Sequence, residues 1–406
     1  MPRLNSRRHV RTAAVAAALA GVMALSACGD KSTDTASSGS GLEITPLAQI
    51  DTQGNEQQAV AENQALDPAG DGKAQCPETT LAQMGALTGA DAALGINMRD
   101  GAQLAVAQHN AANPNCKIVL KTFDTEGDPQ KATQVAPQIV NDKSIVGLIG
   151  PGFSGETKAT GGVFNQAGLV AVTASATNPA LSGNGWKTFF RGLANDDVQG
   201  PAVARYLTGK LGKTKVCVVK DDTEYGAGLS RAIVATLGSA NVASCQGEVK
   251  KGERDFAALI SKITAAKPDA VFFAGYYAEA APLAQQLKTA APDITFVSGD
   301  GANDPQFIKQ AGDSAKGAYL SCPCGPAPSK FKTEYTDKFK QAPGVYSVEA
   351  YDLASILMKG IAEGKRTRAE LLEYVRTYSG VGLARAYEWQ PNGELKSSLI
   401  WMYEVK

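Results

Sequence analysis

Two successive runs of short apolar strands alternating with helices constrain the fold of this 406-residue chain more than any other feature. The first run begins at Thr79 and the second near Asp197. Strands are predicted at 80–87, 118–123, 145–149 and 169–173, and then at 215–220, 241–245, 270–274 and 294–298. Such alternation is typical of parallel sheets that helices cover on both faces. The predicted fold class is therefore α/β, with two doubly wound parallel-sheet lobes.

The C-terminal quarter follows a different pattern. Helices are predicted at 329–340, 347–363 and 368–378. A β-hairpin is predicted across 386–405, because the turn Pro391-Asn392-Gly393 separates two strand-like segments.

The N-terminus has the order of a bacterial lipoprotein signal. Four arginines precede an apolar run at 13–25, which is too short for an ordinary membrane span. The sequence Leu-Ser-Ala-Cys then ends at Cys28, which we expect to carry a lipid after residues 1–27 are removed. An ordinary signal with a chance cysteine is the alternative. The arginine pair at 7–8 partly matches a twin-arginine signal, so the export route stays open.

Residues 28–75 are predicted to form the lipidated cysteine and a flexible tether. The segment from Gly29 to Gln75 is rich in Gly, Ser, Thr, Gln and Asp, which is typical of disorder. The alternative to complete disorder is local order in two stretches of this segment, 42–50 and 55–66.

Six cysteines remain after Cys28, an even number that indicates disulfides in an exported protein. Cys76–Cys116 and Cys217–Cys245 are candidate pairs if the strands beside them are neighbours. The last two cysteines, Cys322 and Cys324, flank one proline and are the third candidate pair. A bond within the last pair is sterically tight and stays open. A metal site is disfavoured, because His109 is the only histidine after residue 27 and no Cys pair has CxxC spacing.

The overall charge excludes one class of partner. The chain has 40 basic and 40 acidic residues, so it has no electrostatic footprint for nucleic acid.

Gly150, Gly152 and Gly155 have the spacing G-x-G-x-x-G of a dinucleotide-binding loop. That function requires an acidic residue at the end of the next strand, and the sequence there, TASATNP, has none. A serine hydrolase is also disfavoured, because Ser154 lacks the final glycine of G-x-S-x-G and a triad would depend on His109 alone. We therefore expect no catalytic activity and no cofactor.

Hydroxyl groups and helix starts remain at two successive strand ends. The loop FSGET carries Ser154 and Thr157, and the next loop, TASATNP, carries Ser175 and Thr177. Helix N-termini and hydroxyls together bind a carboxylate or phosphate without Arg or Lys. The alternative is that these residues only cap helices. Because two successive loops share the feature, we weigh the anion site and the helix caps equally.

Many loops in fixed order resemble one family. GALTG, FDTEGDPQKA, VGLIGPGFSGET, LVAVTASATNP, FFRGLANDDVQG, VVKDDTEYGAGL, VFFAGYYAEA and FVSGDGAND together resemble the type I solute-binding proteins of ABC transporters, and within them the branched-chain amino acid (Leu/Ile/Val) binding group. The resemblance covers residues 79–406. It implies two lobes joined by three hinge strands, near 190–199, 320–326 and 384–390. Lobe 1 would hold 76–195 and 327–386, and lobe 2 would hold 196–326 and 387–406.

The same resemblance implies which residues hold a zwitterion. Ser154, Ser175 and Thr177 match the positions that bind the ligand carboxylate. Asp300 matches the position that accepts the ammonium, and a buried ammonium does require an anion. Tyr276 matches a residue that meets both the ammonium and the ligand side chain when the lobes close. Asp300 as a simple turn residue before a glycine is the alternative.

The side-chain pocket is implied to include Tyr225, Tyr346 and Leu94. Leu94 stands where an aromatic residue often occurs in the family, so the shape of this pocket differs from the family pattern.

The function implied by the resemblance is a lipid-anchored extracytoplasmic protein that captures an amino acid and delivers it to an ABC permease. We expect a monomer that contacts the outer face of the cell membrane through its lipid alone. A ligand sensor on the same fold, or a binder of an amide or short peptide, is the alternative.

Overall fold

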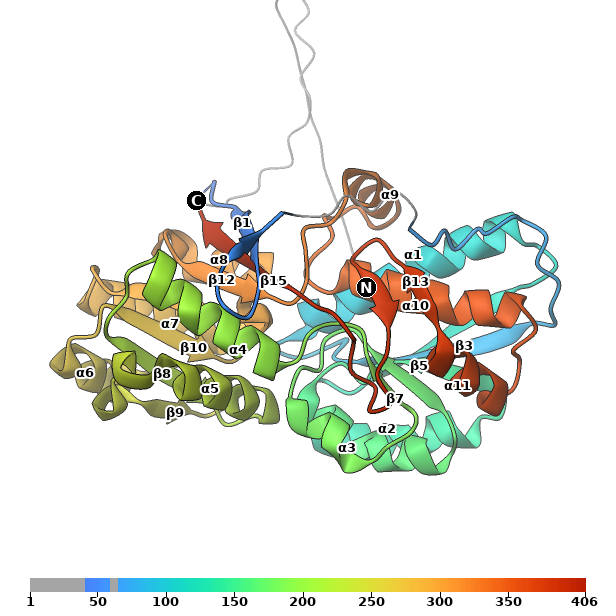
Figure 1. The fold of residues 1–406 in the computed structure, drawn as a ribbon, viewed down its shortest axis with the longest axis horizontal. Coiled ribbons are helices and arrows are strands. Elements are labelled where there is room, and N and C mark those ends of the chain that lie inside the picture. Colours follow the sequence, from blue (N-terminus) through green and yellow to red (C-terminus); the bar gives the residue numbers. More distant parts are fainter. Residues whose placement is uncertain (1–40, 59–64) are drawn as a thin grey trace, which may run out of the picture. The chain divides into compact units, whose positions relative to one another are not determined.

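The computed structural model describes residues 41–58 and 65–406. The predicted signal at 1–27 and the lipidation site Cys28 lie outside the described residues. Two large sheets with helices around them, and a small two-stranded sheet, make up the described chain, and Figure 1 shows the two large sheets in separate lobes. We call them lobe 1 and lobe 2.

Lobe 1 is built on a parallel five-stranded sheet. Its strand order is β4-β3-β5-β6-β7, with β3 (Thr79–Gly85), β4 (Ile118–Asp124), β5 (Ile145–Ile149), β6 (Val170–Thr173) and β7 (Phe189–Arg191). Its helices are α1 (Ala92–Ala112), α2 (Pro129–Asn141), α3 (Ser154–Gln166), α9 (Ser329–Phe339), α10 (Ser347–Ala362) and α11 (Arg368–Thr377). The helix α2 begins with a side-chain cap, since Asp128 accepts from the N–H of Gln130 and Pro129 occupies the first turn.

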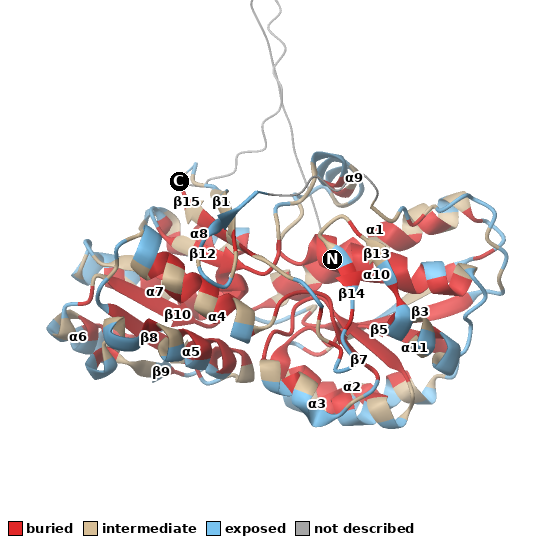
Figure 2. Ribbon diagram, viewed as in Figure 1, coloured by how far each residue is buried: buried red, intermediate tan, exposed pale blue. Residues whose placement is uncertain are grey.

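Alternate strand residues face two helix layers. On β3, Leu81 packs into the core that contains residues of α1 and α10, whereas Ala82 and Met84 pack with residues of α2 and α3. This two-sided burial is the reason that the strands read as continuous apolar runs. Figure 2 shows the central strands of the two large sheets as buried and the outer helix faces as exposed.

Lobe 2 has an eight-stranded mixed sheet in the order β2-β1-β15-β12-β11-β10-β8-β9. Five strands in it are parallel: β8 (Val216–Asp221), β9 (Gly247–Val249), β10 (Ala270–Ala274), β11 (Thr295–Ser298) and β12 (Tyr319–Cys322). Its helices are α4 (Asp196–Arg205), α5 (Glu224–Leu237), α6 (Ala257–Ala266), α7 (Tyr277–Ala290) and α8 (Pro305–Ala311). The doubly wound α/β prediction is confirmed for both lobes.

The predicted tether is wrong for residues 44–57. Here β1 (Ile44–Ile50) and β2 (Glu56–Gln57) extend the sheet of lobe 2, because β1 pairs antiparallel with β15 (Ile400–Val405). Ile50 is fully buried by this pairing. Because β1 pairs with a strand from the far end of the chain, the polar composition of the residues around it does not reveal it as a strand.

The last part of the predicted tether belongs to lobe 1. The N–H of Leu66 donates to the carbonyl of Val381 over 2.8 Å, and a ring nitrogen of His109 lies 3.0 Å from the carbonyl of Pro68. The N-terminal segment therefore contacts lobe 2 through β1 and lobe 1 from Leu66 onward, a connection that the three predicted hinges do not include.

The predicted C-terminal hairpin forms only beside its turn, where Trp389 and Leu395 make an isolated antiparallel bridge, and its two strands then separate. The strand β14 (Ala386–Glu388) pairs with β13 (Ser379–Val381), while β15 joins the sheet of lobe 2. Between them, Gly393 at φ +81° packs its backbone against β7, and its carbonyl accepts from the N–H of Arg191. The third crossing therefore follows this turn, later than the predicted 384–390.

The strand predicted at 241–245 is replaced by short 3-10 turns, Gly238–Ala240 and Ala243–Cys245, and β9 begins only at Gly247. Local i→i+3 hydrogen bonds satisfy the backbone there instead of a ladder.

All three candidate cysteine pairs are brought together. Their Cα–Cα separations are 4.4 Å for Cys76–Cys116, 5.8 Å for Cys217–Cys245 and 4.9 Å for Cys322–Cys324. These values lie within the range of disulfides. Along residues 41–58 and 65–406, none of the helices combines the length and apolar character that a membrane span requires.

Candidate ligand-binding site

The predicted site residues lie at the carboxyl ends of strands that face the interface between the lobes. In lobe 1, Ser154 follows β5 and Thr177 follows β6. In lobe 2, Tyr225, Tyr276 and Asp300 follow β8, β10 and β11. Loops at this end of parallel strands are where open α/β folds bind ligands.

Ser154 and Thr177 form the lobe 1 side. Ser154 is the first residue of α3, and its Oγ accepts from the N–H of Asn178 over 3.2 Å. The hydroxyl of Thr177 is completely buried beside the carboxyl of Asp196, and it lowers the pKa of that carboxyl. No other described residue forms a hydrogen bond with this hydroxyl.

Ser175 differs from the two other predicted carboxylate ligands. Its hydroxyl donates to the carbonyl of Gly152 and lies 3.1 Å from the sulfur of Met98. Because its single hydrogen is committed inside lobe 1, we leave Ser175 out of the ligand contacts proposed below.

A buried arginine that the sequence reading missed holds the Thr177 loop in place. Arg191 donates to the carbonyls of Ala176 and Asn178, and it pairs with Glu394 over 2.9 and 3.0 Å. Its side chain is fully buried. Glu394 comes from the turn of the third crossing, so the ligand loop and the hinge are joined by one ion pair.

Asp300 lies in a short 3-10 turn, Asp300–Ala302, and is fully buried. The hydroxyl of Tyr225 donates to its Oδ1 over 2.8 Å, and the hydroxyl of Tyr346 donates to its Oδ2 over 2.6 Å. Burial raises the pKa of Asp300 above its ordinary value, while the two phenols oppose that rise. The environment therefore favours a positive charge beside this carboxylate.

Tyr225 and Tyr346 thus contact the carboxylate through their hydroxyls, rather than serving as side-chain walls alone. Burial raises the pKa of both phenols well above the ordinary value, so both remain donors at neutral pH. Tyr346 comes from lobe 1 and has φ +68°, a conformation that is costly for a residue with a side chain. That strain directs its hydroxyl across the lobe interface.

Tyr276 belongs to an aromatic group that spans both lobes. Its ring centroid lies 4.6 Å from that of Phe153 in lobe 1 and 5.0 Å from that of Tyr225 in lobe 2. Phe153, which directly precedes Ser154, is a site residue that the sequence reading missed. Leu94 is fully buried in α1 and belongs to the apolar core.

Asp196, at the start of α4, is a second buried carboxylate that the sequence reading missed. Its N–H donates to the carbonyl of Thr177, and its buried carboxyl lies beside the hydroxyl of the same threonine. Burial raises its pKa to about 8. The motif ANDD in the first predicted hinge contains this residue, and it was the sequence signal that could have identified it.

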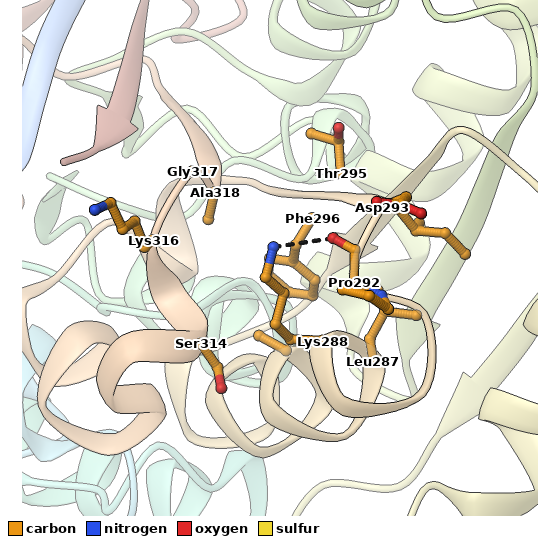
Figure 3. A pocket seen from close by; sticks show the side chains of 12 residues that line it. Leu287, Lys288, Pro292, Asp293, Thr295, Phe296, Ser314, Lys316, Gly317 and Ala318 are labelled. Atoms are coloured by element: carbon orange, nitrogen blue, oxygen red, sulfur yellow. Dashed lines mark hydrogen bonds between the residues drawn. The ribbon is translucent and has the colours of Figure 1, made fainter.

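Two cavities lie away from these residues. One of about 730 Å³ is bordered by the 65–75 segment, α1 and α10. One of about 100 Å³ in lobe 2, shown in Figure 3, lies where Lys288 donates to the carbonyl of Pro292. Neither is lined by a predicted site residue.

Sequence comparisons agree with this geometry. A model of the periplasmic binding protein family matches residues 78–406. An amino acid binding protein of Pseudomonas aeruginosa is 30% identical over 338 residues, which cover 80% of this chain and 90% of that protein. The Leu/Ile/Val-binding protein of Escherichia coli K12 is 28% identical over 324 residues, which cover 78% of this chain and 88% of that protein.

Structural comparisons give the same fold. A branched-chain amino acid transporter substrate binding protein from Streptococcus pneumoniae, in complex with isoleucine, superimposes with a TM-score of 0.75 at 24% identity, covering 81% of this chain and 99% of that one. A solute binding protein from R. palustris, in complex with benzoate, gives 0.73 at 17% identity, covering 81% and 94%. The chain therefore belongs to the periplasmic binding protein family and has the type I fold of its branched-chain amino acid binding members.

Proposed function

We propose that this protein is an extracytoplasmic solute-binding protein that captures one amino acid between its lobes for an ABC permease. The observation that carries the proposal is Asp300, a fully buried carboxylate at the lobe interface that two phenols orient. A buried carboxylate in this setting requires a cationic partner. The ammonium group of an amino acid supplies one.

The other end of the zwitterion is assigned to lobe 1. The hydroxyls of Ser154 and Thr177, with the N–H groups at the start of α3, would donate hydrogen bonds to the ligand carboxylate. Neutral hydroxyls and helix N-termini hold an anion without a second charged residue. Tyr276, Phe153 and Leu94 are assigned to the ligand side chain, which we expect to be aliphatic and branched, as the names of the relatives suggest.

The fold alone leaves the ligand class open, since one structural neighbour holds benzoate. Benzoate has no cationic group, so it would leave Asp300 buried without a counter-charge. Asp300 therefore favours an amino acid over an aromatic acid in this chain.

Calorimetry tests the proposal. The chain from Gly29 onward is unfolded and refolded to remove carried-over ligand, then titrated with leucine, isoleucine, valine and benzoate. N-acetyl-leucine lacks the ammonium group and leucinamide lacks the carboxylate, so each isolates one half of the site. We expect binding of the free amino acids and losses of at least tenfold with both derivatives. Equal binding of leucine and N-acetyl-leucine would refute the role of Asp300.

We also propose the lipid anchor at Cys28. Thirteen residues lie between Cys28 and Leu42, so the anchor would connect to lobe 2 through β1. A chain of this length reaches about 45 Å at most when fully extended. Expression of the full chain and of Cys28→Ser in a bacterial host tests this. The wild type should partition into the detergent phase and Cys28→Ser into the aqueous phase; equal partitioning would refute the anchor.

A further inference from the structure

Lys251 lies at one end of the lobe interface and has no role in the site described so far. It follows β9 in lobe 2, and its Nζ lies 3.2 Å from Oδ2 of Asp91 in lobe 1. The same Nζ lies 5.5 Å from the ring centroids of both Phe153 and Tyr276. Its contacts therefore include the aromatic residues that we assign to the ligand side chain.

Buried carboxylates surround this ammonium group. Asp91, Asp221 and Glu279 are each at most 1% exposed. Oδ2 of Asp221 and Oε2 of Glu279 form no hydrogen bond within the part of the chain that the structure describes. Oδ2 of Asp221 also lies beside Gly275, the residue before Tyr276, where an added Cβ would lie 2.9 Å from it. Asp221 thus lies close to Tyr276, one of the aromatic residues assigned to the ligand side chain.

Few cations compensate these carboxylates. Arg254 also lies near, but its guanidinium donates to the carbonyl of Ala278. Burial raises the pKa of Asp91, Asp221 and Glu279, and Lys251 opposes that rise in all three. Lys251 is the cation that contacts the carboxylate of the opposite lobe and both rings.

Aromatic faces and carboxylates together stabilise a cation. The ammonium group of Lys251 therefore occupies an environment in which a cationic ligand side chain would also be stabilised. The protein fills that environment with its own side chain. A neutral ligand side chain then meets Tyr276 and Phe153 without facing uncompensated charge.

We propose that Lys251 is a specificity-determining residue, which occupies a cation-binding end of the lobe interface and thereby selects amino acids with uncharged side chains. When Lys251 is removed, the same end accepts the cationic side chain of lysine or arginine. The inference rests on the proposed amino-acid function and adds the charge class of the ligand.

The test compares dissociation constants for leucine and lysine in the wild type and in Lys251→Met, which keeps an apolar stem of similar length. Lys251 is 33% exposed, so the substitution is compatible with folding. We expect the ratio Kd(lysine)/Kd(leucine) to fall at least tenfold in Lys251→Met. Lys251→Arg keeps the charge and should keep the wild-type ratio.

Lys158→Met is the matched control. Lys158 also pairs across the lobes, with Glu224 over 2.5 Å, but both side chains are more exposed, at 59% and 38%. Its loss should leave the ratio within about twofold of the wild type, as expected for exposed pairs. Asp91→Asn removes one carboxylate from beside Lys251, so the ratio should rise, and this variant serves if Lys251→Met does not fold.

The outcomes separate the two proposals. An unchanged ratio in Lys251→Met, with leucine binding retained, overturns the role of Lys251 and leaves the amino-acid function intact. A wild type that already binds lysine as tightly as leucine overturns it as well. A wild type that binds no amino acid refutes the proposed function itself.

Discussion

Replacing Asp300 by Asn tests the centre of the proposed site with a small perturbation. Asparagine has the shape of aspartate but cannot carry its charge. Tyr225 and Tyr346 would still have a carbonyl oxygen and an amide group to contact, since the two phenols approach different oxygens. The fold should therefore persist while the partner of the ligand ammonium disappears.

The magnitude follows from burial. A hydrogen bond to a charged group is worth about 1.5–3 kcal/mol, and truncating one member of a buried charge pair costs about 2–5 kcal/mol. Asp300 is fully buried, so about 3 kcal/mol is a fair central value. That corresponds to a loss of roughly two orders of magnitude in affinity for leucine.

Stability should change in the opposite direction. Burial raises the folded-state pKa of Asp300, so ionised Asp300 makes the ligand-free protein less stable as pH rises through that pKa. Asp300→Asn removes this penalty, and we expect an equal or higher melting temperature at pH 7 without ligand. Leucine affinity in the wild type should fall as pH falls through the same pKa, above the range of an ordinary aspartate, and this fall should be absent in the variant.

Calorimetry and thermal melting of both proteins measure these effects. Asp352→Asn is the matched control, because Asp352 is a buried aspartate of lobe 1 that accepts from the N–H groups of Leu383 and Ala384. It should lower stability without changing the preference for leucine over N-acetyl-leucine. Near-normal leucine affinity in Asp300→Asn would refute the assignment of the ammonium to Asp300.

Three further predictions concern single features of the structure. Tyr346→Phe removes one donor to Asp300, so leucine affinity should fall about fivefold to tenfold, and the acid limb of the calorimetric pH profile should move to higher pH; an unchanged profile would contradict this contact. A chain that starts at Ala65 lacks β1, and losing the buried Ile50 with the edge pairing should lower the free energy of unfolding by about 2 kcal/mol or more, so an unaltered denaturant midpoint would argue against the strand. Cys76→Ala opens a pair with a sequence separation of 40 and should cost about 4 kcal/mol by loop entropy, measured by urea unfolding; thiol titration of the unfolded wild type finding free Cys76 and Cys116 would contradict the bond.

The C-terminal part of the chain shows where sequence reasoning stopped. Pro391-Asn392-Gly393 correctly indicates a turn, and a turn between strand-like segments ordinarily makes a hairpin. Here the two segments join different sheets: β14 pairs with β13, which directly precedes it in the sequence, whereas β15 pairs with β12 and β1, which are far away in the sequence. Local patterns specify the turn but not the partners of the strands.

The amino-acid sequence by itself determined the α/β class, the alternation of strands and helices, and the loops that carry Ser154 and Thr177, because periodicity and strand ends are local properties. Asp300 was indicated by the family resemblance. Only the tertiary structure decided how those loops are used. The tyrosine hydroxyls on Asp300 and the contact of Lys251 with Asp91 join residues 46 to 160 positions apart. Burial and strand register bring such groups together, and no single stretch of the sequence determines either of them.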